Sequence, residues 1–321
     1  MTARRNRATG GGRRHGISRR EWFACAALSC AAACGAPRVP AQGGMQWGRS
    51  GTRDGEFHRP RAISATNEEV YVIDTSGRLQ VFTHDGAFLR GWLMPEYENG
   101  TPTGITFAPT GNLLIPDTHY SRVLEYTPQG KLLSQWGEYG ADETRFIYPT
   151  DLALAPDGTC YFSEYGGGAE RVHVFDAQHR FVRQWGTHGD QPGQFSRAMA
   201  IALHEDTVLV CDTANHRIQC FTKSGELLRV IGEPGSATGQ LKYPHDIVLA
   251  PDNTFIVSEY GNNRLSRFTV AGEFVACFGA PGRGPGQFSA PRGVALSPNA
   301  RLFVADTDND RIQRLGVEVL A

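Results

Sequence analysis

Lysine and long helix-forming runs are scarce in this 321-residue chain. It has three lysines and, beyond its N-terminus, no long stretch of Ala, Glu, Lys and Leu. A helical bundle or a coiled coil is therefore not expected. The 32 basic and 33 acidic residues nearly cancel, so net charge gives no indication of nucleic-acid binding. No G-x-S-x-G nucleophile elbow, P-loop or dinucleotide fingerprint occurs, and the corresponding enzyme classes are not indicated.

Glycine and aromatic residues are abundant instead. The chain has 38 glycines, 17 phenylalanines and 10 tyrosines. Many short strands joined by tight turns have this composition. The aromatic content and the modest fraction of charged residues, 20%, exclude wholesale disorder.

The N-terminal segment differs from the rest of the chain. Residues 1–34 hold seven arginines and one acidic residue, and the apolar run at 22–33 is too short to span a bilayer. A basic stretch followed by an apolar one predicts a signal peptide within residues 1–41. The sequence S-R-R-E-W-F at 18–23 resembles the twin-arginine export signal. We therefore expect a protein exported to a bacterial periplasm or cell surface. The remaining chain, with 25 basic and 32 acidic residues, has a net charge of −7.

Two processing routes for this segment remain open. The sequence A-A-A-C-G at 31–35 resembles a degenerate lipobox, in which Cys34 would carry the lipid and tether the protein to a membrane. The sequence V-P-A at 39–41, followed by Gln42, resembles a small-x-small cleavage site that would release it. A membrane is expected as a partner only through the lipid at Cys34.

One phrase of about 47 residues recurs along the remainder of the chain. Its fullest copies are GDQPGQFSRAMAIALHEDTVLVCDTANHRIQCF and GRGPGQFSAPRGVALSPNARLFVADTDNDRIQRL. An acidic residue recurs in each copy, at positions 74, 117, 164, 212, 259 and 306, in steps of 43 to 48 residues. A complete copy contains four short apolar segments separated by turn sequences. Six copies predict an all-β fold over residues 42–321, a six-bladed β-propeller of four-stranded antiparallel blades.

The phrases GPGQF, P-x-G-V-A-L and D-T-x-N-x-R-I-Q resemble the NHL-repeat family over residues 45–315. Members of that family are six-bladed β-propellers, so the resemblance implies the same fold. The second copy lacks the GQF loop, and the third has two extra residues before its arginine.

The ring of blades needs a closing strand, because an open ring leaves two exposed sheet edges. The sixth copy ends at Leu315 without a fourth strand of its own. The sequence M-Q-W-G at 45–48 matches the fourth-strand endings S-Q-W-G at 134–137 and R-Q-W-G at 183–186. We expect residues 45–48 to form the outer strand of the sixth blade.

An acidic residue and an arginine recur together across the loop that follows each second strand. The pairs are Asp74 and Arg78, Asp117 and Arg122, Glu164 and Arg171, Asp212 and Arg217, Glu259 and Arg264, and Asp306 and Arg311. The ends of two paired strands bring the two charges together, with charge-assisted hydrogen bonds between them. A feature present in every copy is expected to be structural.

One position per blade varies and therefore predicts a functional site. It lies at the start of the first strand, where it faces the mouth of the central channel. These mouth residues are Arg61, Thr103, Thr150, Met199, His245 and Arg292. Arg61, His245 and Arg292 come from neighbouring blades of a closed ring and form a cationic arc suited to a carboxylate or phosphate. Tyr243 and Tyr260 are expected on the same face. The alternative is that Arg61 and Arg292 pair with acids such as Asp246 or Glu259.

His245 lies in the sequence Y-P-H-D-I-V, which resembles a segment of peptidylglycine amidating lyase. That family is also a six-bladed propeller, and its zinc is held by one such histidine from each of three blades. Catalytic zinc needs about three protein ligands. The other mouth residues here are Arg, Thr and Met, so we expect no zinc site and no metal ligands. Ca²⁺ at the acidic loop 306–310 is a weaker alternative to that loop being an ordinary turn of the repeat.

Four cysteines follow the signal segment: Cys160, Cys211, Cys220 and Cys277. In the expected register Leu209 opposes Cys220 and Cys211 opposes Ile218. Cys211 and Cys220 then lie diagonally, which is poor disulfide geometry. Buried free thiols are expected.

These observations favour a non-catalytic binding module at the cell envelope, a monomer with no cofactor. Its ligand would be a protein segment, a peptide or an acidic glycan, held at the channel mouth. The alternative is a lyase or hydrolase that uses His245 with Arg61 or Arg292. Some NHL relatives bind RNA, but the acidic remainder of this chain argues against a nucleic-acid partner.

Overall fold

A computed structural model describes residues 44–320 of the chain. The predicted signal segment and the lipidation candidate Cys34 lie outside this range. Within it, no helix combines the length and the apolar character needed to cross a bilayer.

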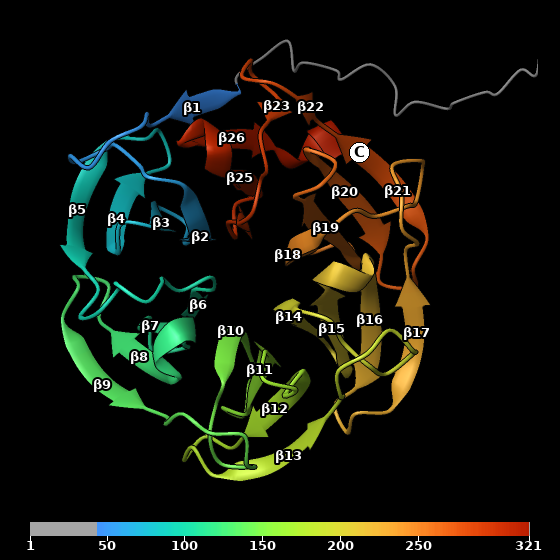
Figure 1. Cartoon of the computed structure of the whole chain (residues 1–321). Helices are drawn as coiled ribbons and strands as arrows, with labels where there is room; N and C mark the ends of the chain where they lie inside the picture. Colours follow the sequence, from blue (N-terminus) through green and yellow to red (C-terminus); the bar gives the residue numbers. More distant parts are fainter. Residues whose placement is uncertain (1–43, 321) are drawn as a thin grey trace, which may run out of the picture. The chain divides into compact units, whose positions relative to one another are not determined.

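Six four-stranded antiparallel sheets follow one another around a central channel, with the first strand of each sheet nearest the centre (Figure 1). This confirms the predicted fold class. The first blade comprises β2 (Pro60–Ala65), β3 (Glu69–Asp74), β4 (Arg78–Thr83) and β5 (Phe88–Leu93). The second comprises β6 (Thr106–Phe107), β7 (Leu113–Asp117), β8 (Arg122–Tyr126) and β9 (Leu132–Trp136). The third comprises β10 (Tyr148–Leu154), β11 (Cys160–Tyr165), β12 (Arg171–Phe175) and β13 (Phe181–Trp185).

The remaining blades follow the same order. The fourth comprises β14 (Ala198–His204), β15 (Thr207–Asp212), β16 (Arg217–Thr222) and β17 (Leu227–Ile231). The fifth comprises β18 (Pro244–Ala250), β19 (Thr254–Glu259), β20 (Arg264–Thr269) and β21 (Phe274–Phe278). The sixth comprises β24 (Val294–Leu296), β25 (Arg301–Asp306), β26 (Arg311–Gly316) and β1 (Met45–Trp47). The short elements outside the blades are β22 (Ala280–Pro281), β23 (Gln287–Phe288), η1 (Thr118–Tyr120), η2 (Thr213–Asn215), η3 (Thr307–Asn309) and η4 (Val317–Leu320).

The hydrophobic core lies between neighbouring blades. The middle strands have apolar residues on both faces, as in β19, where every residue is buried. One core cluster joins Leu209 and Ile218 of the fourth blade to Phe255 and Val257 of the fifth. Each sheet therefore buries both faces against its neighbours, which is why alternation is weak in these strands.

The N-terminal strand closes the ring. Met45 pairs with Arg314 and Trp47 with Ile312, so β1 is the outer strand of the sixth blade, as predicted. The Trp47 ring lies 6.0 Å from Phe82 and 6.2 Å from Phe303, measured between ring centroids. It also covers Gly86, where a Cβ atom would lie 2.6 Å from the indole. Trp47 therefore joins the first blade to the sixth.

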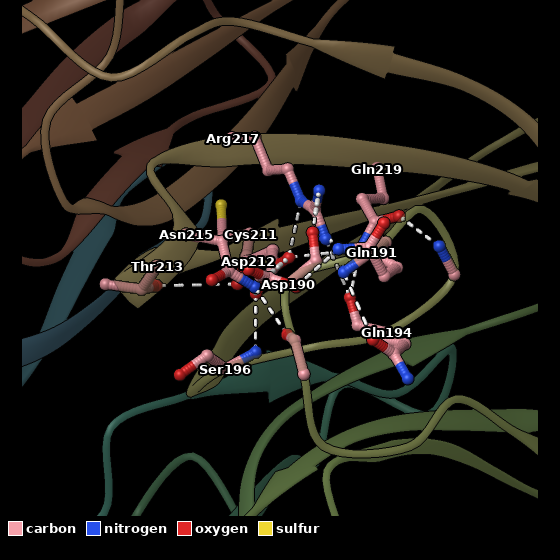
Figure 2. Close-up of polar contacts among 12 residues, drawn as sticks. Asp190, Gln191, Gln194, Ser196, Cys211, Asp212, Thr213, Asn215, Arg217 and Gln219 are labelled. Atoms are coloured by element: carbon pink, nitrogen blue, oxygen red, sulfur yellow. Dashed lines mark hydrogen bonds and ion pairs between the residues drawn. The ribbon is translucent and has the colours of Figure 1, made fainter.

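The recurrent acid–arginine pairs form as predicted, and each extends into a larger network. Figure 2 shows the fourth blade, where the Arg217 Nε donates to Asp212 at 2.7 Å. Its other nitrogens donate to the carbonyl oxygens of Asp190, Gln191 and Gln194 at 2.8–2.9 Å. One guanidinium thus joins the hairpin to the GQF loop. Corresponding arginines in four more blades also donate to their loop carbonyls: Arg78, Arg171, Arg264 and Arg311.

The second blade has a reduced version of this network. Arg122 donates to Asp117 at 2.9 Å and pairs with Glu96 at 2.7 Å. The Asp117 Oδ1 and the Arg122 Nη2 are buried and have no hydrogen-bond partner within residues 44–320. The missing GQF loop explains this difference, because that loop supplies the carbonyl oxygens and backbone N–H groups elsewhere.

The cysteines follow the predicted register, with Leu209 opposite Cys220 and Cys211 opposite Ile218. Cys160, Cys211 and Cys220 are buried and free. Cys277 departs from the expectation, because it is disulfide-bonded. It lies on the outer strand β21 and is half-buried, whereas the three free thiols lie on inner strands within the core.

Loss of the closing strand should destabilise the protein as a whole. Deletion of Met45–Trp47 exposes the edge of β26 and removes Trp47 from the junction of the first and sixth blades. Trp47→Ala alone should lower the free energy of unfolding by about 2–3 kcal/mol, because its ring is half-buried. Urea unfolding followed by circular dichroism measures both effects. Tyr139→Ala, at a side chain that is 69% exposed, is the control. Unchanged unfolding of the deletion variant would contradict ring closure by β1.

The loop network should respond differently in two blades to the same substitution. Arg217→Lys keeps the charge but loses the planar fork that reaches three carbonyl oxygens, and should cost about 2–3 kcal/mol of unfolding free energy. Arg122→Lys, in the blade without these carbonyl contacts, should cost about 1 kcal/mol. Equal losses, measured by the same urea titration, would show that the loop contacts contribute nothing.

Candidate functional site

The six mouth residues divide into two groups. On one side of the ring, Thr103 donates to the carbonyl oxygen of Thr150 at 2.8 Å, and the Thr150 hydroxyl lies 2.8 Å from the carbonyl oxygen of Ala198. These threonines join neighbouring blades. On the other side, the Nε atoms of Arg61 and Arg292 are buried without a hydrogen-bond partner within the described residues, and the Arg292 guanidinium lies against the Tyr260 ring of the fifth blade.

Four of the five predicted ligand-binding residues line one cavity of about 210 Å³: Tyr243, His245, Tyr260 and Arg292. Arg197, Met199, Thr213 and Ala214 complete its lining. The cavity therefore lies where the first strands of the fourth, fifth and sixth blades begin. We call it the histidine pocket.

Arg61 lies elsewhere, in an adjoining cavity of about 150 Å³. Arg59, Arg61, Thr75, Arg292 and Thr307 line it, and we call it the arginine pocket. Arg292 lines both pockets and therefore connects them. A Cβ atom at Gly293 would lie 2.7 Å from the Arg61 carbonyl oxygen, so glycine permits the close approach of the first and sixth blades here.

Arg61 and Arg292 are half-buried and have no carboxylate partner within residues 44–320. Neither forms an ion pair within residues 44–320, and the Nε of each is buried without a hydrogen-bond acceptor. Burial, and then the neighbouring Arg292, lower the pKa of Arg61 to about 10. Burial also lowers the pKa of Arg292, while Tyr260, whose ring centroid lies 5.2 Å from the guanidinium carbon, opposes this effect.

The acids considered as alternative partners are engaged elsewhere. Glu259 accepts from the Nε of Arg264 at 2.6 Å, within its own hairpin network. Asp246 accepts backbone N–H groups of Ile247 and Val294, each at 2.8 Å. The two mouth arginines therefore remain unneutralised by these residues.

His245 is held in its neutral form. Its side chain is buried, and burial followed by the charges of Arg292 and Arg61 lowers its pKa well below the ordinary value of 6.5. The Tyr260 ring lies 6.5 Å from the imidazole, centroid to centroid. A neutral imidazole offers one N–H donor and one nitrogen acceptor to a ligand in this pocket.

The backbone and neighbouring rings fix the pocket's side chains. The backbone N–H of Arg292 donates to Ala305 at 3.1 Å, and its carbonyl oxygen accepts from the Ser258 hydroxyl. The backbone N–H of Tyr243 donates to the Nδ1 of His216 at 3.0 Å, and the two rings meet edge to face at 4.3 Å. The site is therefore largely preorganised.

Two arginines of the site were not predicted. Arg197 and Arg59 lie two residues before the mouth residues Met199 and Arg61, and both have a left-handed backbone, with φ of 58° and 52°. Tyr243 occupies the same position before His245, with φ of 50°. This turn aims the side chain back into the mouth. An alignment of the copies could have identified these arginines, because each lies two residues before a mouth residue.

The described residues do not fit a catalytic zinc ion. Residues 44–320 contain no group of three or more His, Cys, Asp and Glu side chains placed to hold a metal. His245 is the one histidine among the mouth residues. In the acidic loop, Asp306 pairs with Arg311 at 2.7 Å, Asp308 pairs with Arg59 at 2.9 Å, and Asp310 accepts from the Arg59 backbone. The loop's carboxylates thus have protein partners and do not converge on one point.

Comparison with known proteins agrees with the fold and leaves the activity open. The NHL repeat model matches residues 241–268. Rat peptidylglycine alpha-amidating monooxygenase is 32% identical over 142 residues, which cover 40% of this chain and 14% of that protein. A probable peptidyl-alpha-hydroxyglycine alpha-amidating lyase of Caenorhabditis elegans is 31% identical over 130 residues, covering 38% of this chain and 37% of that one. Human NHL repeat-containing protein 3 is 30% identical over 186 residues, 52% of each chain. The matching segments thus span about half of these relatives' length or less.

Solved structures are similar in fold alone. A Bacteroides thetaiotaomicron protein of unknown function has a TM-score of 0.66 at 13% identity, over 85% of this chain and 76% of that one. A streptogramin B lyase structure has a TM-score of 0.60 at 13% identity, over 85% of this chain and 96% of that one. Identity this low transfers no function.

Substitution of His245 should change how stability depends on pH. The unfolded chain takes up a proton near pH 6.5, whereas the folded chain keeps His245 neutral to lower pH. This difference lowers the stability of the folded protein as the pH falls through 6.5, by at most about 1.4 kcal/mol per pH unit. His245→Gln should therefore lose less stability than wild type between pH 7 and pH 5. Urea titrations at several pH values measure this, with the exposed His58→Gln as control. Parallel curves for wild type and His245→Gln would contradict a neutral buried imidazole.

Proposed function

We propose that this NHL-repeat propeller is a binding module of a bacterial cell envelope, whose ligand carries an anionic group held at the channel mouth. The observation that carries the proposal is the pair of half-buried arginines Arg61 and Arg292, whose buried Nε atoms lack an acceptor and which have no carboxylate partner among residues 44–320. Arg197 and the neutral His245 lie with Arg292 in the histidine pocket and add further donors.

Electrostatics favours an anion here. Burying a charge without a partner costs free energy, and two like charges close together add to that cost. The lowered pKa of Arg61 has both causes, burial and the nearby Arg292. An anion between the two guanidinium groups would remove the repulsion and accept hydrogen bonds from both planar forks. Within residues 44–320 Asp308 acts on Arg292 through its charge, but its carboxylate pairs with Arg59.

Export and ligand class are parts of the same proposal. The basic and apolar segment at 1–41 supports delivery to the envelope, either tethered through Cys34 or released after Ala41. A protein segment, a peptide or an acidic glycan would supply the anion, and a monomer suffices because one ring contains the complete mouth. The charge of −7 after the signal segment argues against a nucleic-acid ligand.

A lyase or hydrolase is the second candidate. A neutral imidazole beside cationic groups that bind a carboxylate is the arrangement needed to take a proton from a bound substrate, and this favours His245 as a base with Arg61 or Arg292. The partial similarity to an amidating lyase adds to it. Calorimetry with an α-hydroxyglycine-extended peptide separates the candidates, because binding gives a finite heat and turnover a continuing one.

Anion binding should depend on the two mouth arginines. Thermal unfolding and calorimetric titration measure binding of phosphate, citrate and glucuronate. At least one of these anions should bind the wild-type protein, and its affinity should fall as the salt concentration rises. Arg292→Ala and Arg61→Ala should each weaken that binding about tenfold or more, corresponding to loss of a charged hydrogen bond. Arg183→Ala, on the outer strand β13, is the matched control and should bind as wild type does. No binding of any anion, or equal binding by Arg292→Ala, would overturn the proposal.

A further inference from the structure

The two pockets at the mouth form one continuous cationic site with two places for an anion. Arg292 lines both pockets. The histidine pocket has Arg197 as a second cation, and the arginine pocket has Arg59 and Arg61. A ligand with a single carboxylate would fill one pocket and leave a guanidinium of the other without that partner.

Hydroxyl groups in both pockets indicate what else the ligand carries. Thr213 in the histidine pocket donates its proton to the Pro244 carbonyl oxygen at 2.6 Å. Thr75 and Thr307 in the arginine pocket donate theirs to His58 and Pro60, each at 2.7 Å. Because these protons are already committed, a hydroxyl oxygen that a ligand reaches can only accept a hydrogen bond. Thr75 is partly exposed, whereas Thr213 and Thr307 are buried. The site therefore matches a molecule with anionic groups for the arginines and a hydroxyl donor for Thr75.

Two tyrosine rings add flat apolar surface. Tyr243 is 40% exposed at the edge of the histidine pocket, and Tyr260 lies between His245 and Arg292. Rings of this kind pack against the apolar face of a sugar while their hydroxyls stay hydrated. Phosphate and sulfate have no such apolar face.

We propose that the ligand is an acidic oligosaccharide of uronic-acid units, bound with one carboxylate in the histidine pocket and a second in the arginine pocket. This inference rests on the proposed anion-binding function and names its ligand class. Each uronate unit carries one carboxylate next to several hydroxyls and an apolar ring face, which suits the arginines, Thr75 and the two tyrosines. Arg292, shared by both pockets, lies between the two carboxylates.

Asp308 competes with a ligand for Arg59 in the arginine pocket. Its carboxylate pairs with Arg59 at 2.9 Å, and both side chains are partly exposed, 37% and 46%. A ligand carboxylate in the arginine pocket competes with Asp308 for Arg59. Removing the Asp308 charge should therefore strengthen binding of a ligand that reaches this pocket.

The test compares galacturonate with its α-1,4-linked dimer on the full chain by isothermal titration calorimetry. The dimer should bind at least about tenfold more tightly than the monomer. Once its first carboxylate is bound, the second is held close to its own pocket and binds intramolecularly. Arg59→Gln should reduce this ratio to about twofold, and Asp308→Asn should increase it. Lys131→Gln, on the outer face near β9, is the control and should leave the ratio unchanged. Circular dichroism confirms that each variant is folded.

The outcomes separate this inference from the function on which it rests. If monomer and dimer bind equally and both need Arg292, the anion site stands and the two-carboxylate ligand is wrong. If triglutamate binds more tightly than the digalacturonate with the same dependence on Arg59, the ligand is an acidic peptide and the saccharide is wrong. If neither saccharide, nor phosphate, nor citrate binds, the proposed function falls as well.

Discussion

The pairing of β1 with β26 is the interaction on which the rest of this structure depends. It joins the first described strand to the last and makes the first and sixth blades neighbours. Arg61 of the first blade and Arg292 of the sixth line one pocket at this junction. Further bonds cross it within the site itself, from the Thr307 hydroxyl to the Pro60 carbonyl oxygen and from the Arg59 backbone N–H to Asp310. The junction that closes the ring therefore also forms one side of the cationic mouth.

The repeated features and the varying features of the blades have different roles. Each hairpin arginine in five blades ties its loop down through several carbonyl oxygens, as Arg217 does, and this holds the mouth-facing loops in place. The mouth residues differ from blade to blade: Thr103 and Thr150 bond to the next blade, whereas Arg61, His245 and Arg292 line the two pockets. In the fourth blade the scaffold residue Asp212 and the candidate ligand residue Arg197 lie in one repeat, yet their environments differ completely: Asp212 is fully buried and paired, while Arg197 packs over Tyr165 and lines an open cavity.

The sequence alone predicted the fold well because the repeat makes every blade a copy of the others. The register at Cys211 and the closing strand at Met45–Trp47 both followed from aligning copies. The site was predicted less completely. Arg59 and Arg197 reach the mouth through a left-handed residue, and a β-strand pattern does not reveal that turn. The separation of Arg61 from His245 into adjoining pockets depends on side-chain packing around Arg292, and the disulfide state of Cys277 likewise had no signature in the strand pattern.

The position of the two closing strands also ties binding to the completeness of the chain. β1 is made before any other strand described here, but its partner β26 is made after all the blades' other strands. During synthesis β1 therefore has no partner until β26 is made, and a chain that stops short of β26 leaves the sixth blade without its outer strands. The junction at which Arg59, Arg61 and Arg292 line one pocket is thus completed by the last blade strand to be made.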